Sequence, residues 1–518
     1  MAKSFRGVDR DQQFLLPPDM SQWLPEGHLA WFVISTVDEL DMSVFEDRHR
    51  LGGVGRAAFD PRMLLALLIY AYAVGQRSSR QIERLCATDV GFRVICAQDV
   101  PDHTTIARFR QRHEAGVSQL FTQVLLLCAE AGLGRVGVVA IDGTKIAADA
   151  SISATRTEAS LRAEAQRILG EAAAVDAAED ALFGDARGDE LPPEWTDPRT
   201  RRGKIRAALA ELDARKAAEK DAAVAKSVQI DEHWARRVAR AEADLAATHE
   251  RVQSRYDRHR QAQEDAAAGK GKRPAGSPPV PPEKHVHVRT ARKSVEVNKA
   301  RRAQAASRAQ AGQGKTEDSR TVNLTDPHSG PMPTRCGWVQ GYNAQLAVSE
   351  DQIILAAVLT RQPGDVEQLM PMMDKALQAA QLMNQARKAG AQQEIGLVLA
   401  DAGYLSEDNL NASGPDRLIA VGKRRDLERE ARDNPATGDP PGTDPITLMQ
   451  HRLRTEEGIR TYRRRGAIVE PVNGHVKDRR GLRRFARRGL AAAQSELHLA
   501  AAVTNLLKLY RAPAPATG

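Results

Sequence analysis

The feature that most constrains the fold is an apolar run that ends in a carboxylate. Residues 136–151 read VGVVAIDGTKIAADAS, so Asp142 follows the run directly and Gly143 comes next. A short apolar run bounded by glycine is typical of a buried strand. A carboxylate there is costly to bury unless a partner neutralises its charge. Asp142 therefore either caps the following turn, the commoner case for a single strand-end Asp, or holds a metal ion or a reacting group.

Two later stretches favour the second interpretation. Residues 394–404 read EIGLVLADAGY and repeat the pattern, with Asp401 after an apolar run. Residues 467–485 read AIVEPVNGHVKDRRGLRRF and place Glu470 in a strongly basic region with a helical pattern. Three carboxylates in the order Asp, Asp, Glu suit hard divalent cations, which prefer oxygen ligands. In two-metal phosphoryl transfer, one ion activates the attacking oxygen and the other stabilises the leaving oxygen.

Length and charge point to a multidomain protein with a polyanionic partner. The chain has 518 residues, enough for several domains, and a formal net charge of +8. Charged residues make up 27% and aromatic residues only 4%, so part of the chain is expected to lack a compact core. The four cysteines are widely spaced and form no C-x-x-C pair, which predicts neither a zinc site nor a disulfide framework.

The sequence predicts a soluble, cytoplasmic protein. A polar stretch without a signal-peptide core follows Met1. The longest apolar run, residues 63–74, is too short to span a bilayer. We therefore expect no contact with a membrane.

Residues 1–130 are predicted to form a helical domain. Asp60 and Pro61 fit an N-cap and a first-turn proline, and Gly75 supplies a stop. Ser78, with a glutamine three residues later, fits a capping box for a second helix. A third helix after residue 102 carries three arginines. These helices either dock on DNA or present a solvated surface, and the residues favour neither reading.

Residues 155–315 interrupt the core as a long insertion rich in Ala, Arg, Glu and Lys. A seam with alternating spacings of four and three residues predicts a helical hairpin or short coiled coil. It consists of Trp234, Val238, Ala241, Leu245, Thr248 and Val252. Residues 269–282, rich in Pro and Gly, predict a flexible, basic linker. The insertion is either a solvated element without chemistry or an arm that touches DNA or a second protomer.

The remaining pattern predicts an α/β core formed by residues 136–154 and 320–510, with a disordered tail at 511–518. Two strands at 338–348 and 352–360 fit a hairpin. A helix, the strand that leads to Asp401, one further strand and two helices follow. With the Asp142 strand first, this is a ribonuclease H-like order with a mixed sheet and helices on its faces.

Several sequence motifs carry a resemblance to a known family. The N-terminal motifs are DRDQQFLLPPDMSQWLPEGHLAWF (9–32), FDPRMLLALLIYAYAVGQRSSRQIE (59–83) and PDHTTIARFR (101–110). The motifs of the core are IDGTKIAADAS, GYNAQLAV, ADAGY and VEPVNGHVK, and the last motif is RRFARRGL. In these motifs the chain resembles the DDE transposases of bacterial insertion sequences, in the group with a helical N-terminal transposase domain. The resemblance covers nearly the whole chain outside the insertion.

The resemblance implies a set of site residues. Asp142, Asp401 and Glu470 are then the metal-binding triad, holding two Mg²⁺ or Mn²⁺ ions. Lys477 follows Glu470 after six residues, close to two helical turns, so it shares a face with Glu470 and reaches a phosphate beside the metals. Tyr462 and Arg465 resemble the tyrosine and arginine that precede the glutamate in this superfamily, and the resemblance implies that both contact DNA. Four residues separate that arginine from the glutamate here, where the broad pattern has three.

A basic tract surrounds the glutamate and predicts contact with DNA phosphates. Residues 452–488 contain 13 Lys or Arg against 4 Asp or Glu. Beyond Lys477, the tract continues with Arg480, Arg484, Arg487 and Arg488. Such a run is often only a solvated helix face. Beside a carboxylate triad, phosphate contact is the favoured reading, and it would make DNA affinity steeply dependent on salt.

By resemblance, the activity is that of a transposase. Metal-dependent cleavage at the ends of an insertion sequence would free a 3′-hydroxyl, which would then attack target DNA. Double-stranded DNA, at the transposon ends and at the target, is the expected partner, with a homo-oligomer forming on it. The resemblance therefore also implies association with the nucleoid. Two alternatives stay open: a nuclease or resolvase of the same fold that cuts without joining, and an inactive DNA-binding descendant.

Overall fold

The computed structural model forms two compact units. One unit comprises residues 1–155 and 323–518, and the other residues 156–322. The structure describes residues 19–47, 58–167, 201–270, 278–311, 320–334 and 337–512. Most of the predicted linker, residues 271–277, and most of the predicted tail, residues 513–518, lie outside the described residues.

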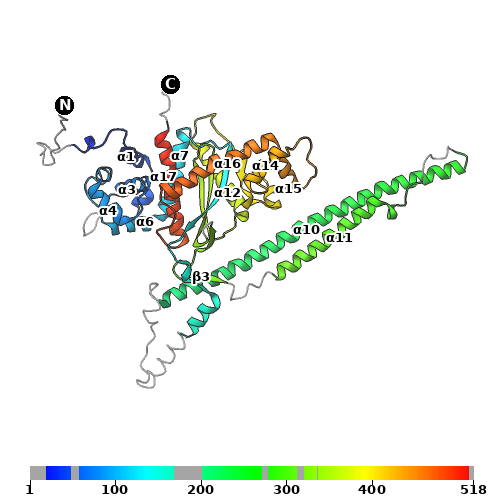
Figure 1. Ribbon diagram of the computed structural model, residues 1–518, viewed down its shortest axis with the longest axis horizontal. Helices are drawn as coiled ribbons and strands as arrows, with labels where there is room; N and C mark the ends of the chain where they lie inside the picture. The colour runs from blue at the N-terminus through cyan, green and yellow to red at the C-terminus, as the bar shows by residue number, and fades with distance from the viewer. Residues whose placement is uncertain are drawn as a thin grey trace, which may run out of the picture. The chain divides into compact units, whose positions relative to one another are not determined.

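A mixed six-stranded sheet forms the centre of the first unit (Figure 1). Its strands are β1 (Val138–Ala147), β4 (Gly330–Thr334), β5 (Gly337–Ser349), β6 (Ile354–Thr360), β7 (Leu397–Ala400) and β8 (Asp416–Ile419). The order is β4-β5-β1-β7-β8, with β6 also paired to β5. β1, β7 and β8 run parallel, whereas β4, β5 and β6 pair in antiparallel fashion. The predicted mixed sheet is confirmed.

The predicted hairpin between β5 and β6 is also confirmed. The amide of Ser349 donates to the carbonyl of Ile353 at 2.9 Å, which closes the turn. Gln352 adopts a φ of 67° within this turn.

Two further elements, β2 (Thr155–Thr157) and β3 (Thr321–Asn323), pair as a separate two-stranded sheet.

Helices cover the sheet, as predicted, because each carries an apolar face. α7 packs against both α12 and α17, and these two helices also contact β6. α16 contacts β1, β5 and β7. The helical segments of this part are η2 (Ile152–Ala154), η5 (Val366–Gln368), α12 (Leu369–Ala386), η6 (Ala402–Tyr404), α13 (Glu407–Asn411), α14 (Arg424–Asp433), α15 (Pro445–Arg454), α16 (Glu456–Gly474), η7 (His475–Arg479) and α17 (Leu490–Arg511). η7 is a single π-helical turn that continues α16.

The N-terminal region is helical, as the sequence predicts. Its elements are η1 (Met20–Gln22), α1 (Leu29–Glu39), α2 (Ser43–Glu46), α3 (Pro61–Ala73), α4 (Ser79–Thr88), α5 (Val90–Ile95), α6 (His103–Arg112) and α7 (Glu114–Glu130). Asp60 caps α3 by accepting from the amide of Arg62, and Gly75 follows with a φ of 80°. Both predicted boundary signals of α3 therefore hold.

The predicted capping box of α4 is wrong. The Ser78 side chain makes no capping hydrogen bond. Instead, α6 secures the first turn: Arg110 donates to the Ser79 hydroxyl and, at 2.8 Å, to the Arg77 carbonyl. A long-range guanidinium thus replaces the local cap that the sequence suggests.

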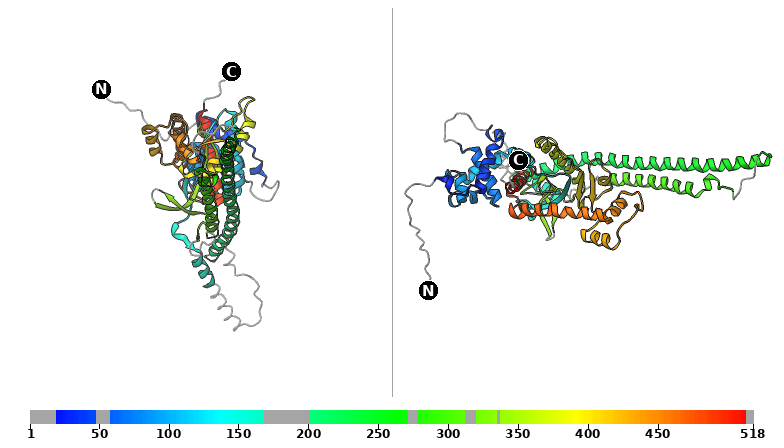
Figure 2. Two further views of the ribbon diagram at one scale, coloured as in Figure 1. Left: turned by 90° about the vertical axis from the view of Figure 1, so that its right-hand side faces the viewer. Right: turned by 90° about the horizontal axis from the view of Figure 1, so that it is seen from above.

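The second unit contains the predicted helical hairpin. α10 (Arg201–Ala267) and α11 (Val286–Ala311) pack side by side, as both views of Figure 2 show, and η3 (Pro282–Lys284) precedes α11. Val238 and Ala241 of the predicted seam are buried. Arg302 of α11 makes two hydrogen bonds of 2.7 Å to the Asp231 carboxylate of α10.

Among the residues that the structure describes, no helix is both long enough and apolar enough to cross a bilayer.

Candidate active site

Two of the three predicted carboxylates lie at matching positions on neighbouring parallel strands. β1 and β7 pair in parallel, with Ile141 opposite Ala400. The next residue on each strand is a carboxylate, Asp142 on β1 and Asp401 directly after β7. Parallel strands in register place residues that follow a matched pair beside each other. The two apolar-run-plus-Asp patterns in the sequence therefore converge in space.

Asp401 caps the turn that follows β7 and is at the same time accessible to solvent. Its Oδ1 accepts from the amide of Gly403 at 2.8 Å and so caps η6. Its side chain nevertheless remains 42% exposed, so the carboxylate is open to further ligands. Asp142 is more enclosed, at 15% exposure, and β1 continues beyond it to Ala147.

Arg465 of α16 bridges the two aspartates. Its Nη2 lies 2.6 Å from Asp142 Oδ1 and 3.6 Å from Asp401 Oδ2. The guanidinium side chain is only 12% exposed, so the contacts are shielded from water. The extra residue between Arg465 and Glu470 therefore does not keep Arg465 away from the carboxylates.

Asn473 is a site residue that the sequence reading missed. Its Nδ2 donates to Asp142 Oδ2 at 2.7 Å, so both oxygens of Asp142 have a partner on α16. Asn473 lies eight positions after Arg465, slightly more than two helical turns, which places both on one face. The Oδ1 atom of Asn473 is buried and has no hydrogen-bond partner among the residues that the structure describes.

A fourth carboxylate, Asp365, lies beside the pair and was also missed. Asn343 and Gln345 of β5 each donate a 2.7 Å hydrogen bond to Asp365 Oδ1, and Lys145 Nζ lies 3.3 Å away. Gly143 makes this approach possible, because a Cβ there would lie 2.5 Å from Asp365 Oδ1. Because Gly143 has no side chain, the Asp365 carboxylate can pack against β1 next to Asp142.

Burial is the main influence on the carboxyl group of Asp142 and raises its pKa to about 6. Arg465 opposes this shift, whereas the negative charges of Asp401 and Asp365 reinforce it. Any additional cation beside Asp142 would act in the same direction as Arg465 and favour the charged carboxylate.

Glu470 does not join the aspartates in this structure. It lies on α16 with a 62% exposed side chain, and its Oε1 is 3.4 Å from Nη1 of Arg424. Gly466, one turn earlier, leaves room for this pair, because a Cβ there would lie 2.7 Å from the Arg424 nitrogen. Across the described ranges, no three His, Cys, Asp or Glu side chains form a group that could hold a metal ion.

Lys477 and Tyr462 flank the site on the same helical segment. Lys477 lies on η7, and burial lowers its pKa while the negative charge of Asp142 acts in the opposite direction. Tyr462 is buried in α16, and burial raises the pKa of its phenol. The π-helical turn changes the periodicity after residue 474, so the simple two-turn relation between Glu470 and Lys477 does not hold along the whole segment.

The four predicted DNA-contact arginines beyond η7 have different surroundings. Arg480 is buried and donates to the Tyr72 and Ala73 carbonyls at the end of α3. Arg487 pairs with Glu114, and Arg488 lies 3.0 Å from Asp149 Oδ2. Arg484 is exposed, and its main chain forms a bridge with Ala147.

Comparison with known protein families gives two matches. Residues 18–112 match the family described as Transposase domain (DUF772), and residues 316–506 match the Transposase DDE domain. Together the matches cover more than half of the chain. No curated protein and no solved structure matches it.

Asp142 lies between the two matched segments, because the insertion separates it from the rest of the core. Its strand β1 nonetheless pairs with β5 and β7, both inside the second match. Strand pairing thus places Asp142 in the same sheet as the matched domain, which also contains Asp401 and Glu470. The chain therefore belongs to the DDE transposases of insertion sequences.

Proposed function

We propose that this transposase catalyses metal-dependent cleavage at the ends of its insertion sequence and then transfers the freed strand into target DNA. The observation that carries the proposal is the convergence of Asp142 and Asp401 on the same nitrogen of Arg465, 2.6 and 3.6 Å away. The positively charged guanidinium of Arg465 thus lies between two acids from distant parts of the chain.

The proposed core is ribonuclease H-like. Its support is the strand order: three antiparallel neighbours, β6, β5 and β1, are followed along the sheet by the parallel strands β7 and β8. The first acid lies on β1 at the centre of the sheet, and the second follows the adjacent strand. The proposed third acid lies on α16, which follows the last strand after two shorter helices, α14 and α15, that the sequence did not predict.

The residues at this site fit a hard divalent cation such as Mg²⁺ or Mn²⁺. Asp142 and Asp401 supply carboxylate oxygens, and the buried Asn473 Oδ1 is an oxygen without a hydrogen-bond partner in the described structure. Oxygen donors are those that such ions prefer. When bound, two ions would activate the attacking oxygen and stabilise the leaving oxygen. Asp142, Asp401 and, after release from Arg424, Glu470 are the residues proposed to hold them.

The chain's own side chains would position the DNA. Arg465 bridges the two aspartates and keeps them side by side before the reaction. Lys477, held near the acids by η7, would contact the phosphate next to the scissile bond. Water attacks that phosphodiester and releases a 3′-hydroxyl, which in turn attacks a target phosphodiester. Because positioning and charge stabilisation carry most of phosphoryl transfer, no covalent protein intermediate is needed.

Double-stranded DNA at the element's ends and at the target is the proposed partner, with assembly into a homo-oligomer on that DNA. Tyr462 and Arg484 stay proposed DNA contacts together with Lys477. Contact by Arg480, Arg487 and Arg488 stays a prediction, and for these three it would require side chains to leave or share their present partners.

The direct test uses the full chain and the DNA that flanks its reading frame. Duplexes carrying the flanking inverted repeats are incubated with Mg²⁺, with Mn²⁺ or with a chelator, and the products are mapped. We expect cleavage at the repeat ends and joined products in the presence of either ion. Cleavage without any joined product would favour the nuclease alternative, and DNA binding without cleavage would favour the inactive descendant.

A further inference from the structure

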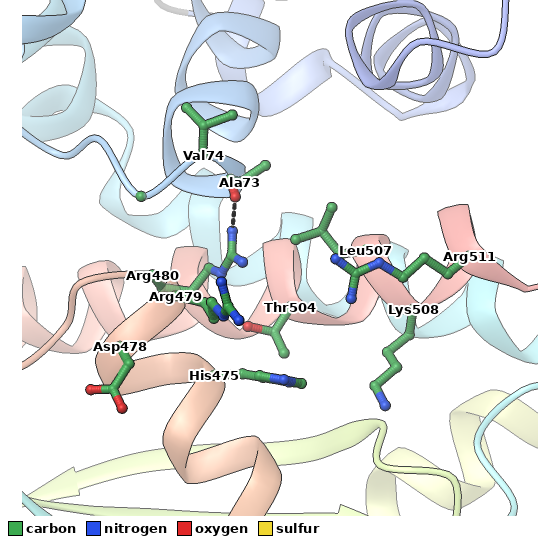
Figure 3. A pocket seen from close by; sticks show the side chains of 11 residues that line it. Ala73, Val74, His475, Asp478, Arg479, Arg480, Thr504, Leu507, Lys508 and Arg511 are labelled. Atoms are coloured by element: carbon green, nitrogen blue, oxygen red, sulfur yellow. Dashed lines mark hydrogen bonds between the residues drawn. The ribbon is translucent and has the colours of Figure 1, made fainter.

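A basic cavity is lined by residues of η7, the π-helical turn that follows Asn473 and Gly474. Its volume is about 620 Å³, and its walls come from the end of α3, from η7 and from the last turns of α17 (Figure 3). Five basic side chains line it: His475, Arg479, Arg480, Lys508 and Arg511. Figure 3 shows these side chains arranged around one hollow.

The positive charge of this cavity is not balanced by its own walls. Asp478 is the single acidic residue among its lining residues, and its carboxylate lies 2.6 Å from Arg483 Nη2. Burial lowers the pKa of His475, and the positive charges of Lys508, Arg480 and Arg511 lower it further. The cations therefore repel one another, and an anion would relieve that repulsion.

The basic side chains that line the cavity differ in whether they already have a partner. Lys508 donates a hydrogen bond to Gln352 Oε1. Arg480 is committed to the fold, because it donates to the two carbonyls that end α3. Arg479 and Arg511 are exposed and make no hydrogen bond or ion pair with any residue that the structure describes. These two guanidinium groups can bind a ligand without breaking an internal contact.

Gly75 brings the walls together. It has a φ of 80°, and a Cβ at this position would lie 2.9 Å from the Arg479 carbonyl. The end of α3 and η7 can therefore approach closely only at a glycine. The cavity thus results from the packing of the end of α3 against η7 and α17.

We propose that this cavity binds a phosphodiester group of a DNA strand, at a position separate from the scissile phosphate. The proposal rests on the proposed function. Its specific support is the shared segment: Asn473 contacts Asp142, whereas Arg479, six residues later, lines the cavity. Six helical residues span roughly 9 Å, the length of a few phosphates along one strand. A strand engaged at the carboxylates therefore has further phosphates within reach of the cavity.

The test measures DNA affinity over a salt series for the double variant Arg479→Ala/Arg511→Ala. DNA affinity falls as salt rises, and each phosphate contact that is lost makes the plot of log affinity against log salt shallower by about 0.9. We expect the slope to fall by about one unit for any DNA sequence, with the thermal unfolding midpoint unchanged. The matched control is Lys375→Ala/Lys388→Ala, which removes two exposed lysines on and just after α12 and should leave the slope as in the wild type.

The outcomes separate this proposal from the proposed function. A wild-type slope in the folded double variant overturns the cavity proposal and leaves the transposase proposal standing. Absence of any DNA binding by the wild-type chain overturns both. If the double variant unfolds, Arg511→Gln at the exposed end of α17 replaces it, with a smaller slope again the supporting result. Binding of inorganic phosphate by the free chain, with an unchanged slope for DNA, would identify a free anion as the ligand and contradict the proposal.

Discussion

Nη2 of Arg465 lies 2.6 Å from Asp142 Oδ1, although 322 residues separate the two along the chain, and 3.6 Å from Asp401. This guanidinium holds together two acids that would otherwise repel each other. A cation arriving at the aspartates would therefore share or replace the role of Arg465.

Arg465→Met tests this role. Removal of one partner of a buried ion pair costs about 3–5 kcal/mol, because the remaining charge is left uncompensated. We expect a lower unfolding midpoint without divalent ions and a larger rise on adding Mn²⁺ than the wild type shows. Thermal unfolding with and without Mn²⁺ measures both effects. An equal rise in the two proteins would contradict competition between Arg465 and a cation.

The Arg424–Glu470 pair should be dispensable for folding. Both side chains are at least half exposed, and pairs of this kind contribute about 0–1 kcal/mol. Arg424→Ala should therefore leave stability nearly unchanged and should not lower the cleavage rate, since it frees Glu470. Glu470→Gln, in contrast, should abolish cleavage while DNA binding persists. Loss of cleavage in Arg424→Ala, with normal DNA binding, would show that the pair belongs to the working site.

Gly143 should not tolerate a side chain. A Cβ there would lie 2.5 Å from both Asp365 Oδ1 and Gln345 Nε2, which are hydrogen-bonded to each other. We expect Gly143→Ala to cost about 1–3 kcal/mol of unfolding free energy. Gly474→Ala is the control, because nothing lies within 4 Å of its Cβ position at the end of α16. Urea denaturation should show the control unchanged or slightly more stable; similar losses in both variants would refute the argument.

Asn505 should stabilise the edge of β6. Its Oδ1 accepts from the Ile354 amide and its Nδ2 donates to the Ile354 carbonyl, both at 2.9 Å in a buried environment. Asn505→Ala leaves both main-chain groups unpaired, at a cost of about 2–4 kcal/mol. Thr504→Ala on the same buried turn should cost less, since the Thr504 hydroxyl bonds only within α17. Equal destabilisation of the two variants by urea would contradict the role of the asparagine.

The sequence was informative where structure depends on neighbours along the chain. The strands before Asp142 and Asp401, the cap at Asp60 and the hairpin at Gln352 all follow from short patterns of apolar residues, glycine and capping side chains. Such patterns also gave the helical character of the N-terminal region. They act over a few residues, and a single sequence displays them directly.

Contacts between distant segments were not visible in the sequence. Asp365 becomes part of the site only because β5 carries Asn343 and Gln345 to it, and Asn473 only because α16 lies on β1. The basic tract gave no sign that Arg480 would bond the end of α3. These partners are chosen by tertiary packing, for which charge and spacing along the chain carry no signal.

The central claim is that Asp142 and Asp401 form the metal-dependent centre of DNA cleavage. The most direct measurement compares cleavage and strand transfer of repeat-end DNA by Asp142→Asn, Asp401→Asn and the control Asp374→Asn, an exposed acid on α12. The account predicts that either site variant loses both reactions at every Mg²⁺ or Mn²⁺ concentration, while DNA binding persists and the control cleaves normally. Cleavage at the wild-type rate by Asp142→Asn or Asp401→Asn would contradict it.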